Sequence, residues 1–165
     1  MSYYIGLPLL LLVALVEAAV LPVFRVAGVQ PNLTLLLLVA WMVVRGQEEV
    51  LYLIPAAGIF LGLVASAPIG AALIALAPVA LLHELRGIHL GEGQLLIVVT
   101  FAILATLLYD LVYVLVHAAA GSLGPLDGVV LDVVLPSVVV NTIVIVPVYA
   151  LVLLASQDIR RSAFV

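Results

Sequence analysis

Four polar side chains in the second half of the chain recur at helical spacing. Thr106, Asp110, Tyr113 and His117 are separated by four, three and four residues within a long apolar segment, which places them on one face of a helix. An ionised carboxylate at the centre of a membrane costs about 2.5–3.5 kcal/mol on insertion scales, so this polar stripe is expected to face protein or water. A carboxyl group, a phenol and an imidazole in one row could relay protons or bind a substrate.

The alternative for the polar stripe is structural, with the same groups joining helices by hydrogen bonds. Asp110 could be protonated, or could bond to Asn141 or Thr142, and each such bond contributes about 0.6–2 kcal/mol in a membrane bundle. One carboxylate and one histidine without a second acidic partner make an incomplete relay. We therefore favour the structural interpretation. The polar residues expected inside the bundle are Thr106, Asp110, Tyr113, His117 and Asn141.

The most polar stretch of the chain contains four potential metal ligands, His83, Glu84, His89 and Glu92. His83 and His89 share no helical face, and glycines interrupt the segment, so we expect a loop in water or headgroups and no metal site. No serine nucleophile elbow, phosphate-binding loop or dinucleotide fingerprint is present. The sequence therefore predicts neither an enzyme nor a cofactor.

Composition places these residues in a membrane. The chain of 165 residues is 67% hydrophobic and 8% charged, whereas a soluble domain has about 45–50% apolar and about 25% charged residues. The absence of cysteine excludes disulfides and cysteine-based metal or redox sites. There is no lysine, and the five arginines are too scattered for a nucleic-acid-binding patch. We expect an integral membrane protein.

Helix breakers divide the chain into six apolar segments. Pro22 ends the first, because proline has no N–H to donate, Pro31-Asn32 opens the second, and Arg45-Gly46 closes it. We predict a single all-α transmembrane domain over residues 1–165, a polytopic bundle of six helices. The predicted spans are residues 4–21, 32–44, 49–65, 71–85, 95–119 and 135–155.

Arginines set the expected orientation. With both termini cytoplasmic, the outer connections hold only Arg25, which we expect to form a structural ion pair with Glu17. The inner segments then hold Arg45, Arg86, Arg160 and Arg161. This excess of positive charge favours both termini inside.

The segment from Ala56 to Leu73 is expected to be a packing centre. Gly58 and Gly62 lie on one helical face, so another helix, from this chain or from a partner, can approach closely there. Small residues continue this face into a tight turn. The candidate packing and partner residues are Gly58, Gly62, Ser66, Pro68 and Gly70.

Three short patterns occur in a set order along the chain. VQPNLTLLLLVAWMVVRG forms a leucine-rich span between Pro-Asn and Arg-Gly, ASAPIG supplies a small-residue turn, and LPSVVVNTIVIVPVYALVLL carries proline, asparagine and proline. The residues are Pro31, Asn32, Arg45, Gly46, Ser66, Pro68, Gly70, Pro136, Asn141 and Pro147. In this order the patterns resemble the MreD family, six-span rod-shape-determining membrane proteins of bacteria.

The resemblance implies a non-enzymatic subunit of the cell-elongation machinery in the bacterial inner membrane. Its implied partners are the single-span protein MreC, RodA, a penicillin-binding transpeptidase and, indirectly, the actin-like MreB. An aspartate is often found six residues before the turn proline in this family, and this chain has Gly62 there. A role tied to that acid is therefore not carried over.

The resemblance also implies a fold similar to the substrate-binding components of energy-coupling-factor vitamin transporters, which supplies a second hypothesis. A transporter component needs an outward-facing pocket with several polar groups, whereas a scaffold needs an apolar groove or face for a partner helix. The connections at 23–30 and 66–70 are too brief to cover a vitamin. The sequence therefore favours the scaffold.

Overall fold

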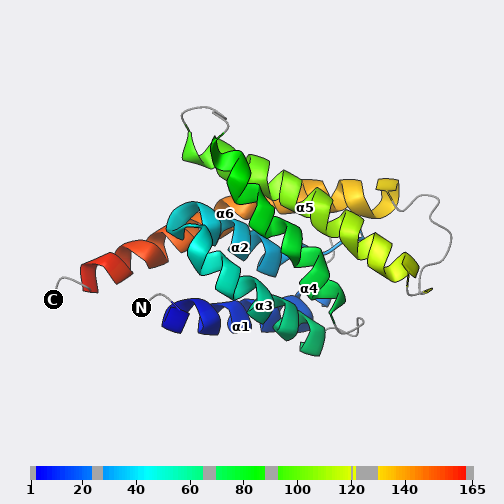
Figure 1. Ribbon diagram of the computed structural model, residues 1–165, viewed down its shortest axis with the longest axis horizontal. Helices are drawn as coiled ribbons and strands as arrows, with labels where there is room; N and C mark the ends of the chain where they lie inside the picture. Colours follow the sequence, from blue (N-terminus) through cyan, green and yellow to red (C-terminus); the bar gives the residue numbers. More distant parts are fainter. Residues whose placement is uncertain are drawn as a thin grey trace.

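The computed structural model describes residues 3–23, 28–64, 70–87, 93–119, 121 and 130–162, and of residues 3–5, 64, 83–87, 130, 131 and 157–162 the backbone alone. Within these ranges the protein is all-α, with six α-helices. They are α1 (Tyr3–Ala19), α2 (Leu33–Arg45), α3 (Gln47–Val64), α4 (Ala71–Leu76), α5 (Gln94–Ala119) and α6 (Leu135–Ser162). Successive helices run in opposite directions, and α1 begins on the side where α6 ends (Figure 1).

Three stretches of the described chain are long and apolar enough to cross a membrane, judged by length and composition. They are Gly6–Val23, Gln94–Ala119 and Asp132–Ser156. Leu33–Arg45 and Ala71–Leu82 are shorter apolar helices. The prediction of an all-α protein is thus confirmed, and three of its helical stretches are candidate membrane spans.

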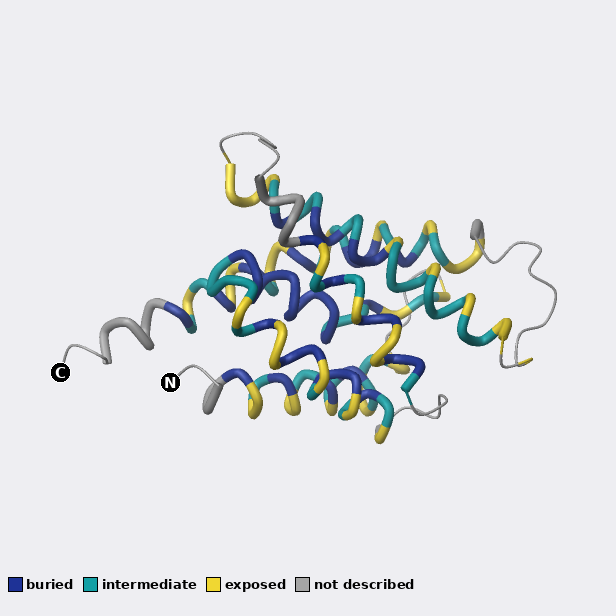
Figure 2. The backbone as a smooth tube through the Cα atoms, in the orientation of Figure 1, coloured by how far each residue is buried: buried dark blue, intermediate teal, exposed yellow. Residues whose placement is uncertain are grey.

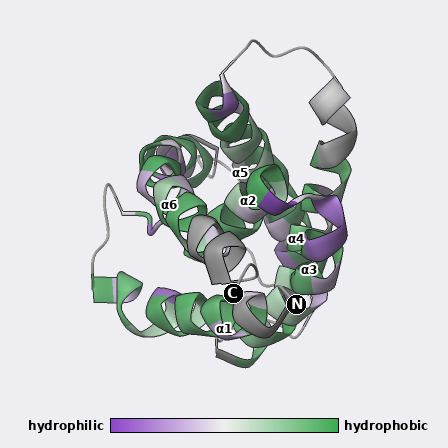
Figure 3. Cartoon of the chain, turned by 90° about the vertical axis from the view of Figure 1, so that its left-hand side faces the viewer, coloured by the Kyte–Doolittle hydropathy of each residue, from purple (hydrophilic) through white to green (hydrophobic). Residues whose placement is uncertain are grey.

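Helix α2 lies at the centre of the bundle. Every residue from Thr34 to Val43 is buried, so the helix has no face toward the outside. A helix that is apolar all round lies in a protein core or spans a membrane, and in the end-on view the other helices surround α2 (Figure 3). The burial map shows the same enclosed centre and an outer surface of exposed residues (Figure 2).

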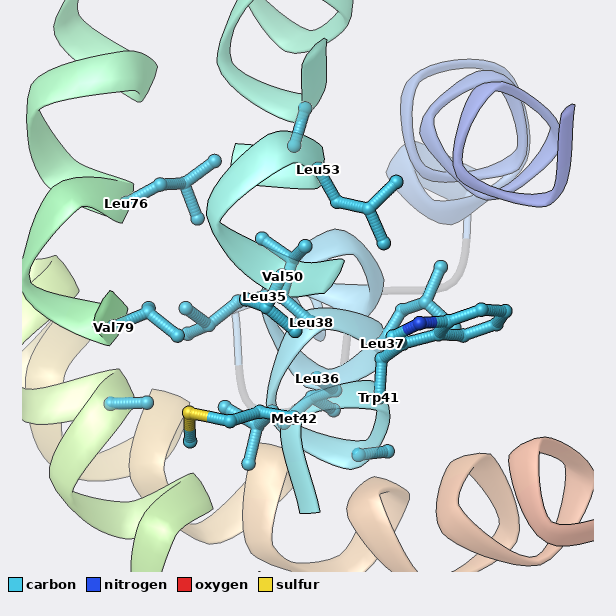
Figure 4. Packing of buried hydrophobic residues seen from close by; sticks show 14 of the residues in the cluster. Leu35, Leu36, Leu37, Leu38, Trp41, Met42, Val50, Leu53, Leu76 and Val79 are labelled. Atoms are coloured by element: carbon cyan, nitrogen blue, oxygen red, sulfur yellow. The ribbon is translucent and has the colours of Figure 1, made fainter. Parts of the chain in front are cut away.

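The side chains of α2 form the core together with residues from its neighbours. Leu35, Leu38 and Met42 are fully buried, and they lie near Val50 of α3 and Val79 of the segment after α4 (Figure 4). Fully burying such side chains contributes about 1.5–3 kcal/mol each when the alternative is water. Inside a membrane the same contacts act through van der Waals packing.

The fourth helix changes from an α-helix to a 3₁₀ helix along its length. Its α-helical part ends at Leu76 and continues as a 3₁₀ helix, η2 (Ala77–Gly87). Pro78 lies at this change, and proline cannot donate the backbone hydrogen bond that an α-helix would require there. The predicted span at 71–85 covers most of this segment, whereas the loop expected for the polar stretch that includes His83 and Glu84 is wrong for residues 83–87, whose backbone is helical. Residues 88–92 lie outside the described chain.

Helix α6 begins at the predicted residue, Leu135, and is longer than predicted at its C-terminal end. It follows a π-helical turn, η3 (Val130–Val134), and it continues to Ser162, beyond the predicted end at 155. The prediction used the end of the apolar run as a boundary. A helix satisfies its own backbone hydrogen bonds, so it can continue past the point at which its side chains become polar.

The glycine pair of α3 packs within the chain, against α4. A Cβ atom on Gly58 would lie 2.6 Å from the Cα atom of Leu73, whereas on Gly62 the nearest neighbour would be the backbone nitrogen of Gly70, at 3.9 Å. Close approach therefore depends on Gly58, and its partner is a helix of the same chain.

Two glycines at helix ends have a backbone conformation that other residues rarely adopt. Gly46, after α2, has φ +103°, and Gly70, before α4, has φ +93°. The Gly46 N–H donates to the Met42 carbonyl at 3.0 Å, which ends α2 and allows α3 to begin one residue later. Ser66 and Pro68 of the predicted turn lie outside the described residues.

Candidate functional site

Three helices meet in a chain of hydrogen bonds at the N-terminal end of α2. The Asn32 backbone N–H donates to the Asn141 Oδ1 atom of α6 at 3.0 Å. The Asn141 side-chain amide donates to the Thr106 hydroxyl of α5 at 3.1 Å. Asn32 also caps α2, because its Oδ1 atom accepts the Leu35 N–H at 2.9 Å. We call Asn32, Thr106 and Asn141 the asparagine junction.

The buried Glu17 of α1 completes the cap of α2. Its Oε2 atom accepts the backbone N–H of Thr34 at 2.8 Å. The first N–H groups of a helix have no partner within the helix, and the helix dipole favours negative charge at that end. Glu17 therefore has a structural reason to lie inside an apolar helix. Arg25, its predicted partner, lies outside the described residues.

A partly open cavity of about 410 Å³ lies next to this end of α2. Its walls come from α1, from the connection before α2, from α5 and from the start of α6, with smaller contributions from α3 and α4. The described lining residues are Glu17, Gly28, Val29, Gln30, Pro31, Asn32, Leu61, Ala72, Tyr109, Asp110, Tyr113, Asp132, Val133 and Ser137. The cavity lies on the side of the bundle away from the start of α1 and the end of α6.

Three carboxyl groups line the cavity, and none of its described lining residues is basic. Asp132 is exposed, and Glu17 is buried and bonded to α2. The Oδ2 atom of Asp110 is buried and has no hydrogen-bond partner among the described residues. Buried polar atoms are nearly always paired in proteins, so this oxygen is an unsatisfied acceptor within the cavity wall, although the same carboxyl group also interacts with the Ser137 side chain.

Aromatic rings form a second part of the wall. The rings of Tyr109 and Tyr113 are stacked, with centroids 5.8 Å apart. Tyr109 lies close enough to interact with the side chain of Asn32 and with the charge of Glu17. The cavity therefore combines carboxylates, a phenolic pair and apolar side chains.

The four residues of the predicted polar stripe lie in three different environments in the structure. Thr106 belongs to the asparagine junction, whereas Asp110 and Tyr113 line the cavity. The His117 ring packs on Tyr113 with centroids 4.1 Å apart, and its Nδ1 atom lies 3.0 Å from the Tyr113 carbonyl oxygen.

Asn141 and Thr142, suggested from the sequence as partners of Asp110, have other partners. Asn141 bonds to Thr106 and Asn32, and the Thr142 hydroxyl donates to the Val138 carbonyl at 2.7 Å. Both are one turn of α6 or more away from Ser137, which is the α6 residue that joins Asp110 in the cavity wall. The sequence shows which residues share one helix face, but it does not give the register between two helices.

Several residues that line the cavity were not predicted from the sequence. Tyr109 precedes Tyr113 by four residues, so helical spacing was a usable signal for it. Asp132 and Ser137 belong to the π-helical turn and the first turn of α6, and no periodic pattern connects them with α5. Their contribution depends on the packing of α5 against α6.

The four potential metal ligands of the sequence lie at the end of η2 and in the sequence between η2 and α5. His89 and Glu92 lie outside the described residues, and the side chains of His83 and Glu84 are not described. Elsewhere in the described chain, no group of three His, Cys, Asp or Glu residues is placed to hold a metal ion.

At the opposite end of α2, Glu49 of α3 contacts two side chains of α2. Its Oε2 atom accepts the Trp41 indole N–H at 2.9 Å and lies 3.4 Å from the Arg45 Nε atom. The Gln47 side-chain amide donates to the Ala80 carbonyl at 3.3 Å. These contacts hold the α2–α3 turn and leave no open acceptor comparable with Asp110 among the described side chains at this end.

Comparisons with models of protein families, with curated proteins and with solved structures give no match. Proposals about function therefore rest on the motifs of the chain and on the geometry of its residues.

Proposed function

We propose that this chain is a non-enzymatic scaffold subunit of the bacterial cell-elongation complex, similar to MreD and located in the inner membrane. The observation that carries the proposal is the hydrogen bond between Asn32 and Asn141. These residues come from two of the three MreD-like patterns and are 109 positions apart in the sequence. Their contact supports the view that the patterns belong to one architecture.

Two further residues of the MreD-like patterns are glycines at positions where the backbone has a positive φ angle. Gly46 and Gly70 both have positive φ, at the end of α2 and at the start of α4. Substituting a residue with a side chain would strain either position. The pattern residues thus have identifiable structural roles at three places in the bundle.

The proposal includes six membrane crossings with both termini in the cytoplasm. α2 and the α4–η2 segment are short, but α2 is surrounded by protein and need not match the thickness of the lipid. The alternating helix directions place the start of α1 and the end of α6 on one side (Figure 1). The arginine distribution favours the cytoplasm for that side.

The expected partner is a single-span helix like that of MreC, with RodA and a penicillin-binding transpeptidase in the same assembly and MreB bound indirectly. The face of α3 at Gly58 is covered by α4, so the partner would use another face. Tyr52, Ile59 and Leu63 are exposed at spacings of seven and four on α3. Apolar packing on this face would resist salt but would not tolerate bulky polar substitution.

Site-specific photocrosslinking tests this proposal in a rod-shaped host. A crosslinker at Ile59 or Leu63 should capture the MreC-like protein, whereas one at Leu115 on α5, which is about as exposed as Ile59, serves as the control. Depletion of the chain should make the cells round. Retained rod shape after depletion, together with no crosslink from α3, would refute the scaffold role.

The cavity favours a second candidate, the substrate-binding component of an energy-coupling-factor-type vitamin transporter. Its volume of about 410 Å³ and its several polar groups match the usual small-ligand site. It also lies on the side expected to face outward. A vitamin that copurifies with the protein and binds saturably would support this candidate over the scaffold.

A further inference from the structure

We propose that the cavity beside the N-terminal end of α2 binds a small organic cation, a ligand with an ammonium group on an apolar body. The site is made by Asp110 and Asp132 as charge partners and by Tyr109 and Tyr113 as an aromatic wall. It does not depend on the scaffold role, because neither elongation nor partner binding is used in the argument.

The charge of the lining selects a cation. Glu17, Asp110 and Asp132 line the cavity, and none of the other described lining residues is basic. The N-terminal end of α2 offsets part of the Glu17 charge, because Glu17 accepts the Thr34 N–H. Asp132 is exposed, and the side chain of Asp110 interacts with the uncharged Ser137, so neither carboxyl group has a basic partner among the described lining residues, and these residues carry an excess of negative charge.

Asp110 is the lining residue that most clearly indicates a hydrogen-bond donor on the ligand. Its Oδ2 atom is buried without a partner among the described residues, although it lies in a residue that lines the cavity. A carboxylate inside a membrane segment normally faces a partner or a water-filled space. An ammonium group carries three N–H donors and no acceptor, so it complements the carboxyl groups of Asp110 and Asp132 in the cavity wall.

The aromatic pair selects an organic cation. Tyr109 and Tyr113 are stacked at 5.8 Å between centroids, and both line the cavity with apolar residues such as Leu61 and Val133. Aromatic faces attract ammonium groups, and the apolar lining accommodates a hydrocarbon body. A bare metal ion fits less well, because no three acidic or histidine side chains of the described chain are placed around one point.

The first experiment uses two probes that differ in charge and little in shape. Benzylamine, which is cationic at neutral pH, and benzyl alcohol, which is neutral, are titrated into the purified full-length protein in detergent. Thermal stability and isothermal titration calorimetry are measured on the same samples. We expect saturable binding and a raised Tm with benzylamine, and neither effect with benzyl alcohol.

Three variants locate the binding. Asp110→Asn keeps the side-chain shape and should weaken benzylamine binding about ten- to a hundred-fold, the range for a hydrogen bond to a charged group. Asp132→Asn, at an exposed position, provides a second test that does not threaten folding. Glu48→Gln is the matched control, since Glu48 is exposed in the first turn of α3, at the far end of α2, and does not line the cavity.

A second arm identifies the source of the ammonium group. Native mass spectrometry of the protein in lipid mixtures compares phosphatidylethanolamine with phosphatidylglycerol. Selective retention of phosphatidylethanolamine, lost in Asp110→Asn and kept in Glu48→Gln, assigns the site to a lipid headgroup. Benzylamine binding without lipid retention assigns it to a free amine.

Several results would overturn the proposal. Equal effects of the two probes, equal binding by Asp110→Asn and the wild type, or no binding in either arm would show a water-filled cavity only. The scaffold role is tested separately by cell shape. Round cells on depletion with no cation binding would leave the scaffold in place and remove this site.

Discussion

Replacing each glycine of α3 by alanine separates close helix packing from helix propensity. At Gly58 the new methyl group would lie 2.6 Å from the Leu73 Cα atom and 2.7 Å from its Cβ atom. At Gly62 the nearest atom would be 3.9 Å away, an ordinary contact. The two positions are one turn apart on the same helix, so they form a matched pair.

The expected difference follows from these distances. Ordinary carbon contacts are about 3.5–4.0 Å, so α3 and α4 would have to separate by about 1 Å at Gly58. Overpacking of this kind costs about 1–3 kcal/mol, whereas alanine in place of glycine within a helix gains about 1 kcal/mol in propensity at both sites. Because the propensity gain cancels, Gly58→Ala should be less stable than Gly62→Ala by about 1–3 kcal/mol.

Reversible unfolding in mixed micelles, followed by circular dichroism, measures this difference. The additional variant Leu73→Ala should relieve the Gly58→Ala clash only in part, because the Leu73 Cα atom remains. If the two glycine variants agree within about 0.5 kcal/mol, which is the usual limit of additivity, the assignment of the close contact to Gly58 is wrong.

Two further predictions concern the polar side chains. Asn141→Ala removes the hydrogen bonds to Thr106 and Asn32 and should lower the free energy of unfolding by about 1–3 kcal/mol, measured in the same micelles. Thr142→Ala is the control, because the Thr142 hydroxyl bonds to a carbonyl within α6, and it should lower the free energy of unfolding by less. Asp110→Asn should keep the fold and rod shape, because an amide can replace the carboxyl group inside the bundle; a well-assembled variant with round cells would instead show that the charge is needed for elongation.

Local patterns were sufficient to predict the helices. Proline, glycine and asparagine at helix ends gave the limits of α2 to within one residue, because these residues act through their own backbone or cap. The polar continuation of α6 to Ser162 was not predicted, because the length of an apolar run indicates how much of a helix can lie in lipid and not where the helix ends. The span predicted at 71–85 covers most of α4 and η2, but the change to a 3₁₀ helix after Leu76 was not predicted.

The candidate site was predictable only in part. Helical spacing identified Asp110 and Tyr113 as inward-facing residues, and both line the cavity. It could not show that Glu17 bonds to the N-terminal end of α2, or that Asn141 bonds to Thr106 while Asp110 interacts with Ser137. Those contacts depend on how helices are shifted and rotated against one another, and no periodicity within one helix contains that information.

The length of α2 gives a physical reason for the position of the cavity. At 13 residues α2 is about 20 Å long, whereas α5, with 26 residues, is about 39 Å long. A short central helix inside longer neighbours leaves space beyond one of its ends. At the C-terminal end of α2 the direct turn into α3 and the contacts of Glu49 occupy that space.

At the N-terminal end of α2 the space remains open, and the unpaired N–H groups of the helix require acceptors there. Asn32 and Glu17 supply them, which places polar side chains inside the apolar bundle. Once these groups and the residues before α2 line the space, a carboxyl group on α5 can face it without contacting lipid. The same short helix that forms the core therefore accounts for the polar cavity beside it.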